Sequence, residues 1–429
     1  MHIWNANLGA IEIEGAPVEE TRRCYTALWH SMVQPRDRTG DHWDSSESFW
    51  DDHYTLWDSW KTLFPLLNII DPATSGSIVN SFIARHKHNQ DGYVATAFVS
   101  GVEYRTGQGG DEVENVIADA FLKKVPGVNW QEAYALLKHH ADTSGRTESY
   151  RSLGYVPFGE TAPYCNRLKS ASGTLGFAIN DFSVSEVAKG LGKTEDAERF
   201  RKRSENWKNV WDDSAEDSGY TGFPRGRRRD GAFTDTGLRK NYNVDFYEAT
   251  SWEMAYAPNF ALSEIVAKMG GKEKFVERLK FAFKNKWIDF GNEPSFMTPW
   301  LFAAMGRPDL SSYWADMYKN RYKGRELPGD DDQGAMSSMY IFLISGFFPI
   351  AGQDIYYLHG PSVPKTTWHL ANGKTFVISA QNVSKRNIYI QSATLNGRPL
   401  NAAVIHYSDI EQGGTLGFVM GETPSKWGY

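Results

Sequence analysis

Three consecutive carboxylates, Asp330, Asp331 and Asp332, form the stretch of this sequence that is best equipped for chemistry. Gly329 and Gly334 flank them, and glycine permits a tight turn or a close approach of the backbone to another group. Adjacent negative charges repel one another, and Asp is a poor residue for a helix interior. The pattern therefore predicts a loop, which is either a solvated turn or a device that directs carboxylates into a site.

Two further segments place a carboxylate in unusual surroundings. Glu248 stands among the aromatic residues of segment 246–253, which could lower the local polarity and raise the pKa of its carboxyl group. The alternative is a glutamate at a helix N-terminus, favoured by the helix dipole. Asn292 and Glu293 lie in a GNEPS loop, whose carboxylate, amide and carbonyl oxygens suit a hard cation such as calcium. A turn before a proline-started helix explains this loop nearly as well.

Aromatic residues make up 14% of the chain, with 15 Trp, 21 Tyr and 24 Phe. They fit either a large core or a sugar site, since flat rings stack on the apolar faces of pyranoses and their N–H or O–H groups reach hydroxyls. Trp57 beside Asp58 is a candidate pair of this kind, one stacking and the other hydrogen bonding. A core tryptophan next to a helix-capping aspartate is the alternative.

Composition and missing motifs narrow the classes of function. A net charge of −6 gives no reason to expect a nucleic acid or anionic membrane partner, and no run of about 18 apolar residues predicts a membrane span. Cys24 and Cys165 make neither a disulfide framework nor a metal motif, and no signal peptide is visible. The motifs of zinc proteases, serine hydrolases, nucleotide enzymes and dehydrogenases are absent. Carboxylates without a nucleophile motif point toward glycoside hydrolysis, in which one carboxyl protonates the leaving oxygen and another activates water.

The elements that position these groups are predicted to be mainly helical. Between residues 70 and 345 the dominant apolar period is that of a helix, and no clear strand alternation interrupts it. This favours a helical toroid or bundle over an α/β fold, and the loops 218–236 and 290–299 are where chemistry is expected. The period is clearest in residues 111–124, 181–210 and 261–283.

After residue 350 the pattern changes to short segments of β-branched and aromatic residues in near alternation. Asn-Gly and Gly-Gly dipeptides separate them, as in tight hairpin turns. We therefore predict a helical domain over residues 1–350 and a small antiparallel β domain over residues 351–429. The strands are expected near Thr375–Ser379, Asn387–Ile390 and Thr415–Met420.

Read end to end, the chain carries an ordered series of motifs, which is more specific than any one of them. The series comprises Cys24–His30, Leu56–Asp58, Ser152–Pro157, Trp252, Gly291–Pro294, Leu327–Asp332, Gly346–Ile350 and Gly413–Leu416. On these motifs the chain resembles glycoside hydrolase family 92, the calcium-dependent exo-acting α-mannosidases, over nearly all of its 429 residues.

The resemblance implies an (α/α)6 barrel that normally follows an N-terminal β-sandwich domain. The match begins just before the barrel, so the sandwich is expected to be missing from this chain. Secretion or export to the periplasm is implied by the family. The implied substrates are α-mannosides such as N-glycan or mannan termini.

The resemblance also implies the roles of individual residues. Glu248 stands at the position of the general acid, Asp332 at that of the base that activates water, and Asp330 at that of a carboxylate that assists the base. The implied reaction inverts the anomeric centre, with acid and base about 6.5–9.5 Å apart to admit a water molecule. The family's calcium ion is placed near Asn292 and Glu293. In addition, Trp57 and Asp58 match residues that hold the terminal mannose.

Several positions depart from the family pattern. Lys61 replaces an Arg and loses its bidentate fork, Gly176 replaces a Glu, and Met339 replaces a Trp. The other departures are Ala249, Met254, Asn259 and Phe260. Each change removes a group able to bind a sugar hydroxyl or orient a neighbour. The alternative hypothesis is therefore a catalytically impaired or inactive member of the family that still binds mannosides.

Overall fold

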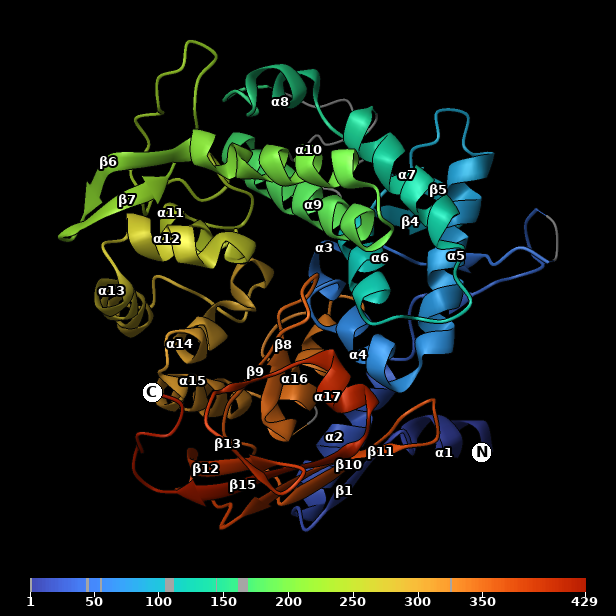
Figure 1. Ribbon diagram of the computed structural model, residues 1–429, viewed down its shortest axis with the longest axis vertical. Coiled ribbons are helices and arrows are strands. Elements are labelled where there is room, and N and C mark those ends of the chain that lie inside the picture. The colour runs from blue at the N-terminus through green and yellow to red at the C-terminus, as the bar shows by residue number, and fades with distance from the viewer. Residues whose placement is uncertain are drawn as a thin grey trace.

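Helices are the main secondary structure of the chain up to residue 345, and strands collect at its C-terminal end (Figure 1). This computed structural model describes residues 2–43, 46–54, 56–104, 112–143, 145–160, 169–324 and 326–429. Cys165 lies outside these ranges, whereas Cys24 is buried. None of the helices in the described ranges is long and apolar enough to span a lipid bilayer.

The helices are α1 (His2–Leu8), α2 (Val18–His30), α3 (Leu56–Ser59), α4 (Leu63–Ile70), α5 (Pro72–His88), α6 (Glu112–Leu122), α7 (Trp130–Asp142), α8 (Glu148–Leu153), α9 (Ser170–Gly190), α10 (Thr194–Ser204), α11 (Ser251–Met254), α12 (Leu262–Lys268), α13 (Lys272–Lys284), α14 (Leu301–Ala304), α15 (Pro308–Lys319), α16 (Ala335–Ser345) and α17 (Tyr407–Glu411). Short 3-10 turns complete them: η1 (Glu205–Val210), η2 (Asn259–Ala261), η3 (Glu293–Ser295) and η4 (Thr298–Trp300). In Figure 1, α5 to α7 lie on the right, α8 to α10 across the top and α11 to α15 on the left, with α16 nearer the centre.

Local sequence explains where these helices begin and how they pack. The Asp71 side chain accepts a hydrogen bond from the Thr74 amide, and Pro72 opens α5 where its missing N–H costs nothing. The apolar face predicted in segment 111–124 is buried in α6. Every residue of α16 is buried, and this helix packs against α2, α4 and α15. Because α16 is central, the loop that precedes it is held on a rigid support.

A six-stranded sheet covers one end of the helical region (Figure 1). Its order is β1-β10-β11-β15-β12-β13, and all neighbours are antiparallel except β11 and β15, which are parallel. Its strands are β1 (Ile11–Glu14), β10 (Lys365–His369), β11 (Thr375–Gln381), β12 (Tyr389–Leu395), β13 (Arg398–Leu400) and β15 (Gly414–Gly421). The second sheet has the order β14-β9-β8, with β8 (Phe347–Pro349), β9 (Tyr356–Leu358) and β14 (Val404–Ile405).

The predicted mainly helical fold with a small C-terminal sheet is confirmed, and each of the three predicted strands overlaps an observed one. The arrangement of the helices as a toroid stays a prediction. The division at residue 350 also stays a prediction, and strand β1 from the N-terminal region joins the C-terminal sheet beside β10. The larger of two apolar clusters among the described residues continues from the helices into this sheet, where Phe342 of α16 stacks near Trp368 of β10.

The expectation that no strand interrupts residues 70–345 was wrong. Strands β6 (Trp211–Asp217) and β7 (Tyr220–Pro224) form a hairpin that takes up the start of the predicted loop 218–236. Its turn residues Ser218 and Gly219 both have positive φ, as a two-residue hairpin turn requires. A register shift breaks the alternation that would have marked the strands in the sequence. Two smaller hairpins are β2 (Arg36–Asp37) with β3 (Trp50–Asp51), and β4 (Ala97–Val99) with β5 (Val102–Tyr104).

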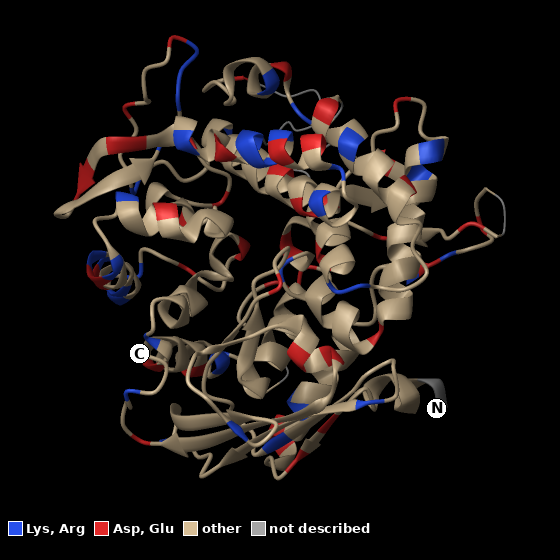
Figure 2. Ribbon diagram, viewed as in Figure 1, with Lys and Arg blue, Asp and Glu red and all other residues tan. Residues whose placement is uncertain are grey.

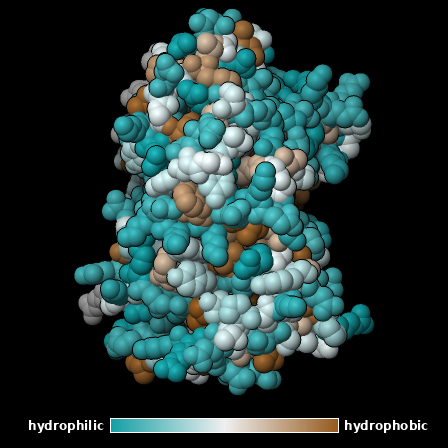
Figure 3. All heavy atoms as spheres, turned by 90° about the vertical axis from the view of Figure 1, so that its left-hand side faces the viewer, coloured by the Kyte–Doolittle hydropathy of each residue, from teal (hydrophilic) through white to brown (hydrophobic). Residues whose placement is uncertain are grey.

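Charge is distributed unevenly over this fold. The helices α10 and α13 carry acidic and basic residues together at the periphery, whereas acidic segments also occur near the centre of the molecule (Figure 2). The face that includes α13 is largely hydrophilic with scattered apolar groups (Figure 3). Because carboxylates are rarely buried without a partner, the central acidic segments identify the part of the fold where a site is to be sought.

Candidate active site

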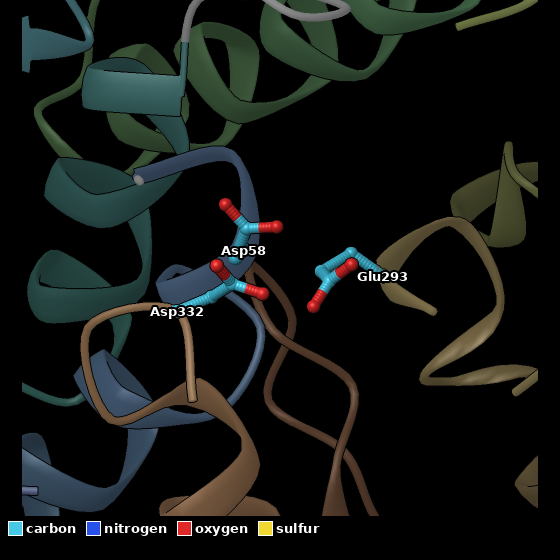
Figure 4. Close-up of side chains that lie close together, drawn as sticks. All are labelled: Asp58, Glu293 and Asp332. Carbon is cyan, nitrogen blue, oxygen red and sulfur yellow. The ribbon is translucent and has the colours of Figure 1, made fainter. Parts of the chain in front are cut away.

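Three carboxylates from distant parts of the chain converge near the centre of the molecule. Asp58 belongs to α3, Glu293 opens η3, and Asp332 lies in the loop before α16. One carboxylate oxygen from each lies within 4.8 Å of those of the other two. Figure 4 shows Asp58 and Asp332 on one side and Glu293 approaching from the other. We call these three residues the carboxylate cluster.

Burial makes the charged form of the carboxylate cluster costly. Asp58 is 3% exposed and Glu293 4% exposed. Loss of hydration raises the pKa of Glu293 to about 7, and the charge of Asp332 acts in the same direction. Burial also raises the pKa of Asp58 well above its usual range, and the charges of Glu293 and Asp332 add to this. At neutral pH the cluster therefore needs protons or a cation to be stable.

Lys61 supplies one positive charge beneath the cluster. Its ammonium group is buried, donates a hydrogen bond to the Trp57 carbonyl at 2.7 Å, and lies 4.9 Å from the ring of Trp60. Its charge lowers the pKa of both Asp58 and Glu293. One ammonium against three carboxylates leaves the site negative, so a divalent cation suits it electrostatically.

The residues present fit a calcium ion. Calcium binds oxygen ligands at about 2.3–2.6 Å, so oxygens around one ion lie within about 5 Å of each other, as they do in the carboxylate cluster. The buried Oδ2 of Asp58 has no hydrogen-bond partner among the described residues, and a buried carboxylate oxygen without a partner is costly. Asp58, Glu293 and Asp332 are thus the residues that could hold the ion.

The loop before α16 has an unusual backbone that aims Asp332 at the cluster. Asp332, Gln333 and Gly334 have φ values of 45°, 60° and 82°, three consecutive left-handed residues. A Cβ on Gly334 would lie 3.0 Å from the Cα of Ser31, so glycine is required there by both conformation and space. The side-chain amide of Gln333 donates to the backbone carbonyl of Asp52 at 2.8 Å and holds the loop in place.

The three consecutive aspartates have three different environments. Asp331 accepts from the Ser337 amide at 2.9 Å and pairs with Nδ1 of His30 at 3.1 Å, so it anchors the loop to α16 and α2. Asp330 is exposed. Asp332 is half-buried, and burial raises its pKa, with the charges of Asp330, Asp331 and Glu248 adding to the effect. Only Asp332 of the three belongs to the cluster.

Glu248 lies at the edge of the site, outside the carboxylate cluster. It is half-buried, and its charge acts on Asp332. Helix α11 begins after Thr250, and Glu253 forms the capping box there, so the helix N-terminal role considered for Glu248 belongs to Glu253. Glu248 itself has a left-handed backbone, with φ of 48°.

The GNEPS loop forms the predicted turn before a proline-started helical segment, whereas its role in binding a cation stays a prediction. Pro294 follows Glu293 in a short 3-10 turn, and Asn292 donates through its side-chain amide to the Glu248 carbonyl at 3.1 Å. A Cβ on Gly291 would collide with the hydroxyl of Tyr318, so the loop lies directly against α15. This close packing brings Glu293 from the α13–α14 connection to the cluster.

The neighbouring residues Trp57 and Asp58 have different surroundings, and only Asp58 belongs to the carboxylate cluster. Trp57 is only 8% exposed and contacts Tyr247 edge to face at 5.3 Å, so most of its surface is core. It lines a cavity of about 60 Å³. Lys61, Gly176 and Met254 line the same cavity, which Pro294 next to Glu293 also lines, so three of the departures from the family pattern gather at one place close to the cluster.

The sequence reasoning missed several residues that shape the site. Gln333, which ties the loop of Asp332 to the Asp52 carbonyl, and Asn243, which accepts from the Glu248 amide, were not singled out. The pairing of Asp331 with His30 was also missed. These contacts join segments far apart or ordinary polar residues in turns, and no local pattern marks them.

Comparison with known proteins identifies the family. Residues 1–422 match the glycosyl hydrolase family 92 catalytic domain. The chain therefore belongs to glycosyl hydrolase family 92.

Individual relatives agree with this assignment. An uncharacterized secreted glycosidase of Arthroderma benhamiae is 29% identical over 99% of this chain and 56% of its own length. A family GH92 α-mannosidase from Bacteroides thetaiotaomicron superposes with a TM-score of 0.90 at 25% identity, over 99% of this chain and 58% of its own. An inverting mannosidase of the same organism has the same fold, with a TM-score of 0.88 at 23% identity over 99% of this chain and 62% of its own. The chain thus spans a little over half the length of its relatives.

Proposed function

We propose that this protein is an exo-acting α-mannosidase that hydrolyses terminal α-mannosidic bonds with inversion. The observation that carries the proposal is the convergence of Asp58, Glu293 and Asp332 beside Glu248 in a family 92 chain. The α-mannosidase relative, 25% identical, has also been seen in complex with mannoimidazole, which supports a mannoside as the substrate. The secreted relative supports secretion or export to the periplasm.

In the proposed mechanism, Glu248 is the general acid and Asp332 the general base. Asp332 removes a proton from water, whose oxygen attacks the anomeric carbon, while Glu248 gives its proton to the departing glycosidic oxygen. The raised pKa of Asp332 makes it a stronger base, because a base works best when its pKa approaches the working pH. Exposed Asp330 assists through its charge, which is the largest electrostatic contribution to that raised pKa.

We further propose that calcium is held by Asp58, Asn292 and Glu293, with Asp332 at the edge of its site. A bound calcium ion supplies positive charge that binds sugar hydroxyls and offsets the buried carboxylates. The chain's own contribution is to hold these oxygens together from three rigid supports. Trp57 and Asp58 are proposed to contact the terminal mannose, with the small exposed part of Trp57 as the contact.

A second function is favoured by the cavity that Trp57 lines. Because Lys61, Gly176 and Met254 all line it, the groups that would support the site in the family pattern are lost together. We keep as the second candidate a protein that binds mannosides with impaired or no turnover. Calorimetric binding of mannose-terminated glycans with no product, or only a trace, over long incubation supports this candidate, and efficient turnover excludes it.

The test of the proposed function is the release of free mannose from α-1,2-, α-1,3-, α-1,4- and α-1,6-linked manno-disaccharides, with calcium and with a chelator. Calcium-dependent release establishes the activity and identifies the linkage. No release from a folded chain calls for a repeat with a β-sandwich domain added, since the relatives are nearly twice as long. If no mannose is released in that repeat either, the proposal is refuted.

A further inference from the structure

The backbone of Glu248 adopts a conformation that its residue type disfavours. Its φ of 48° lies in the left-handed region, where a Cβ crowds the following carbonyl. Residues other than glycine stay in this region only when the surrounding structure holds them there, and such residues concentrate at functional sites. The contacts on either side of Glu248 therefore need an explanation.

Two asparagine side chains bind the two backbone groups of Glu248. The Glu248 amide donates to Oδ1 of Asn243 at 2.8 Å, and the Glu248 carbonyl accepts from Nδ2 of Asn292 at 3.1 Å. Asn243 is exposed and comes from the preceding turn, whereas Asn292 comes from the loop that carries Glu293. Both backbone hydrogen-bonding groups of one residue are thus used by side chains. We call Asn243 and Asn292 the asparagine clamp.

The surroundings of the clamp are themselves fixed. The amide before Glu248, that of Tyr247, donates to the hydroxyl of Ser172 at 2.8 Å. On the other side, Ser251 donates through its amide to Oδ1 of Asn241 at 3.1 Å. The chain is therefore held before and after Glu248, and the clamp decides the conformation of the residue between these two anchors.

We propose that Asn243 and Asn292 are positioning residues that hold Glu248 in the conformation from which it protonates the leaving oxygen. This inference rests on the proposed function of Glu248 as the general acid. Relaxation of Glu248 to negative φ turns its Cα–Cβ bond to a new direction, and a carboxyl group displaced by about 1 Å can lose about 100-fold in rate. The clamp also links the acid to the loop of Glu293, one residue from Asn292.

The alternative is that both asparagines only stabilise turns. The dependence of rate on the leaving group separates the two roles. A dinitrophenyl α-mannoside has a good leaving group that departs without a proton, whereas a manno-disaccharide needs the acid. A poorly positioned acid therefore slows the disaccharide far more than the activated substrate, and a turn that is merely less stable affects both alike.

The sharpest variants alter one contact at a time. Asn243→Gly removes the acceptor and suits the positive φ of 54° at that position, while Asn243→Asp keeps an acceptor oxygen. Asn292→Ala removes the second contact. Asn285→Ala, at an exposed asparagine at the end of α13, is the matched control.

We expect Asn243→Gly and Asn292→Ala to lower kcat on the disaccharide by about 10- to 100-fold and kcat on the dinitrophenyl mannoside by less than about threefold. Asn243→Asp and the control keep both activities. Calcium calorimetry shows whether Asn292→Ala also affects the ion, whereas Asn243→Gly is expected to leave calcium affinity unchanged. Equal losses on both substrates, or no loss, overturn the clamp.

Glu248→Gln distinguishes a failed clamp from a failed assignment of the acid. If this variant shows no preference for the activated substrate, the role of Glu248 is wrong; if it does and the clamp variants behave as wild type, the clamp alone is wrong. Hydrogen exchange gives a readout without activity. Asn243→Gly is expected to speed exchange of the Glu248 amide by at least about tenfold, and unchanged exchange at that amide overturns the clamp.

Discussion

Replacement of Glu293 by Gln should make the calcium-free protein more stable, although it removes a residue of the proposed site. The pKa of Glu293 is raised from 4.5 to about 7 in the folded chain. A carboxyl group whose pKa is higher when folded binds more protons in the folded state, so its ionisation destabilises the fold as the pH rises through this interval. Gln keeps nearly the same shape and never ionises.

The magnitude follows from the same two values. At about 1.36 kcal/mol per pH unit, the interval from 4.5 to about 7 corresponds to a cost of about 3 kcal/mol at pH 8 and to almost none at pH 4.5. Near the melting temperature the unfolding entropy is about 2 cal/mol/K per residue, so for 429 residues this cost corresponds to roughly 3 °C in apparent Tm. Glu293→Gln should remove this cost.

The assay is thermal unfolding of wild type and Glu293→Gln in chelator, from pH 4.5 to pH 8. The two proteins should melt together at pH 4.5, and the variant should melt higher at pH 8. Calcium at about 1,000 times its dissociation constant should reverse the order, because it stabilises wild type by about 4.1 kcal/mol, which exceeds the cost of about 3 kcal/mol, and it finds one ligand fewer in the variant. Glu422→Gln at an exposed position is the control. A variant that is equal to or less stable than wild type at pH 8 in chelator refutes the reasoning.

Three further outcomes are expected. Asp332→Asn and Glu248→Gln should each lower kcat on manno-disaccharides by more than about 100-fold, as general acid–base roles demand. Unchanged kcat in steady-state assays would refute the role of the residue as general acid or base. Lys61→Met should cost about 3–5 kcal/mol in urea unfolding at pH 8, because it leaves the buried carboxylates without their counter-charge, and a loss below about 1 kcal/mol contradicts this. Gly334→Ala should cost at least about 1–2 kcal/mol, because alanine is strained at a φ of 82° and its Cβ meets Ser31; wild-type stability in the same assay would show that the loop adjusts freely.

The sequence was sufficient for the elements whose signal is local. Helical spacing predicted α6, α12 and α13. Helix α13 buries one face, α12 buries Ile265, and α6 is buried on all sides from Glu112 to Ala120, so its spacing marked the helix although its polar residues are buried too. The Asn396-Gly397 dipeptide was predicted as a turn, and both residues adopt positive φ there, but the strand β13 that follows it and pairs with β12 was not predicted. The hairpin β6–β7 was missed because its register shift removes the alternation on which strand prediction depends.

The sequence predicted the individual residues of the candidate site, but it did not predict how they are arranged in space. The ordered motifs led to Asp58, Glu293 and Asp332 separately, but their convergence depends on the packing of α3, η3 and α16, which no local pattern encodes. The same limit applies to the three aspartates. Only the folded loop shows that Asp331 is used by His30 while Asp332 enters the cluster.

The central claim is that this chain hydrolyses α-mannosides with inversion. The measurement that tests it most directly is proton NMR of the reaction on an α-linked manno-disaccharide in the presence of calcium, repeated with the β-sandwich domain added if the chain alone releases no mannose. An inverting α-mannosidase should release β-mannose first, with α-mannose appearing only later as the free sugar mutarotates. Release of α-mannose first would contradict the roles given to Glu248 and Asp332. Absence of any mannose would contradict the activity itself.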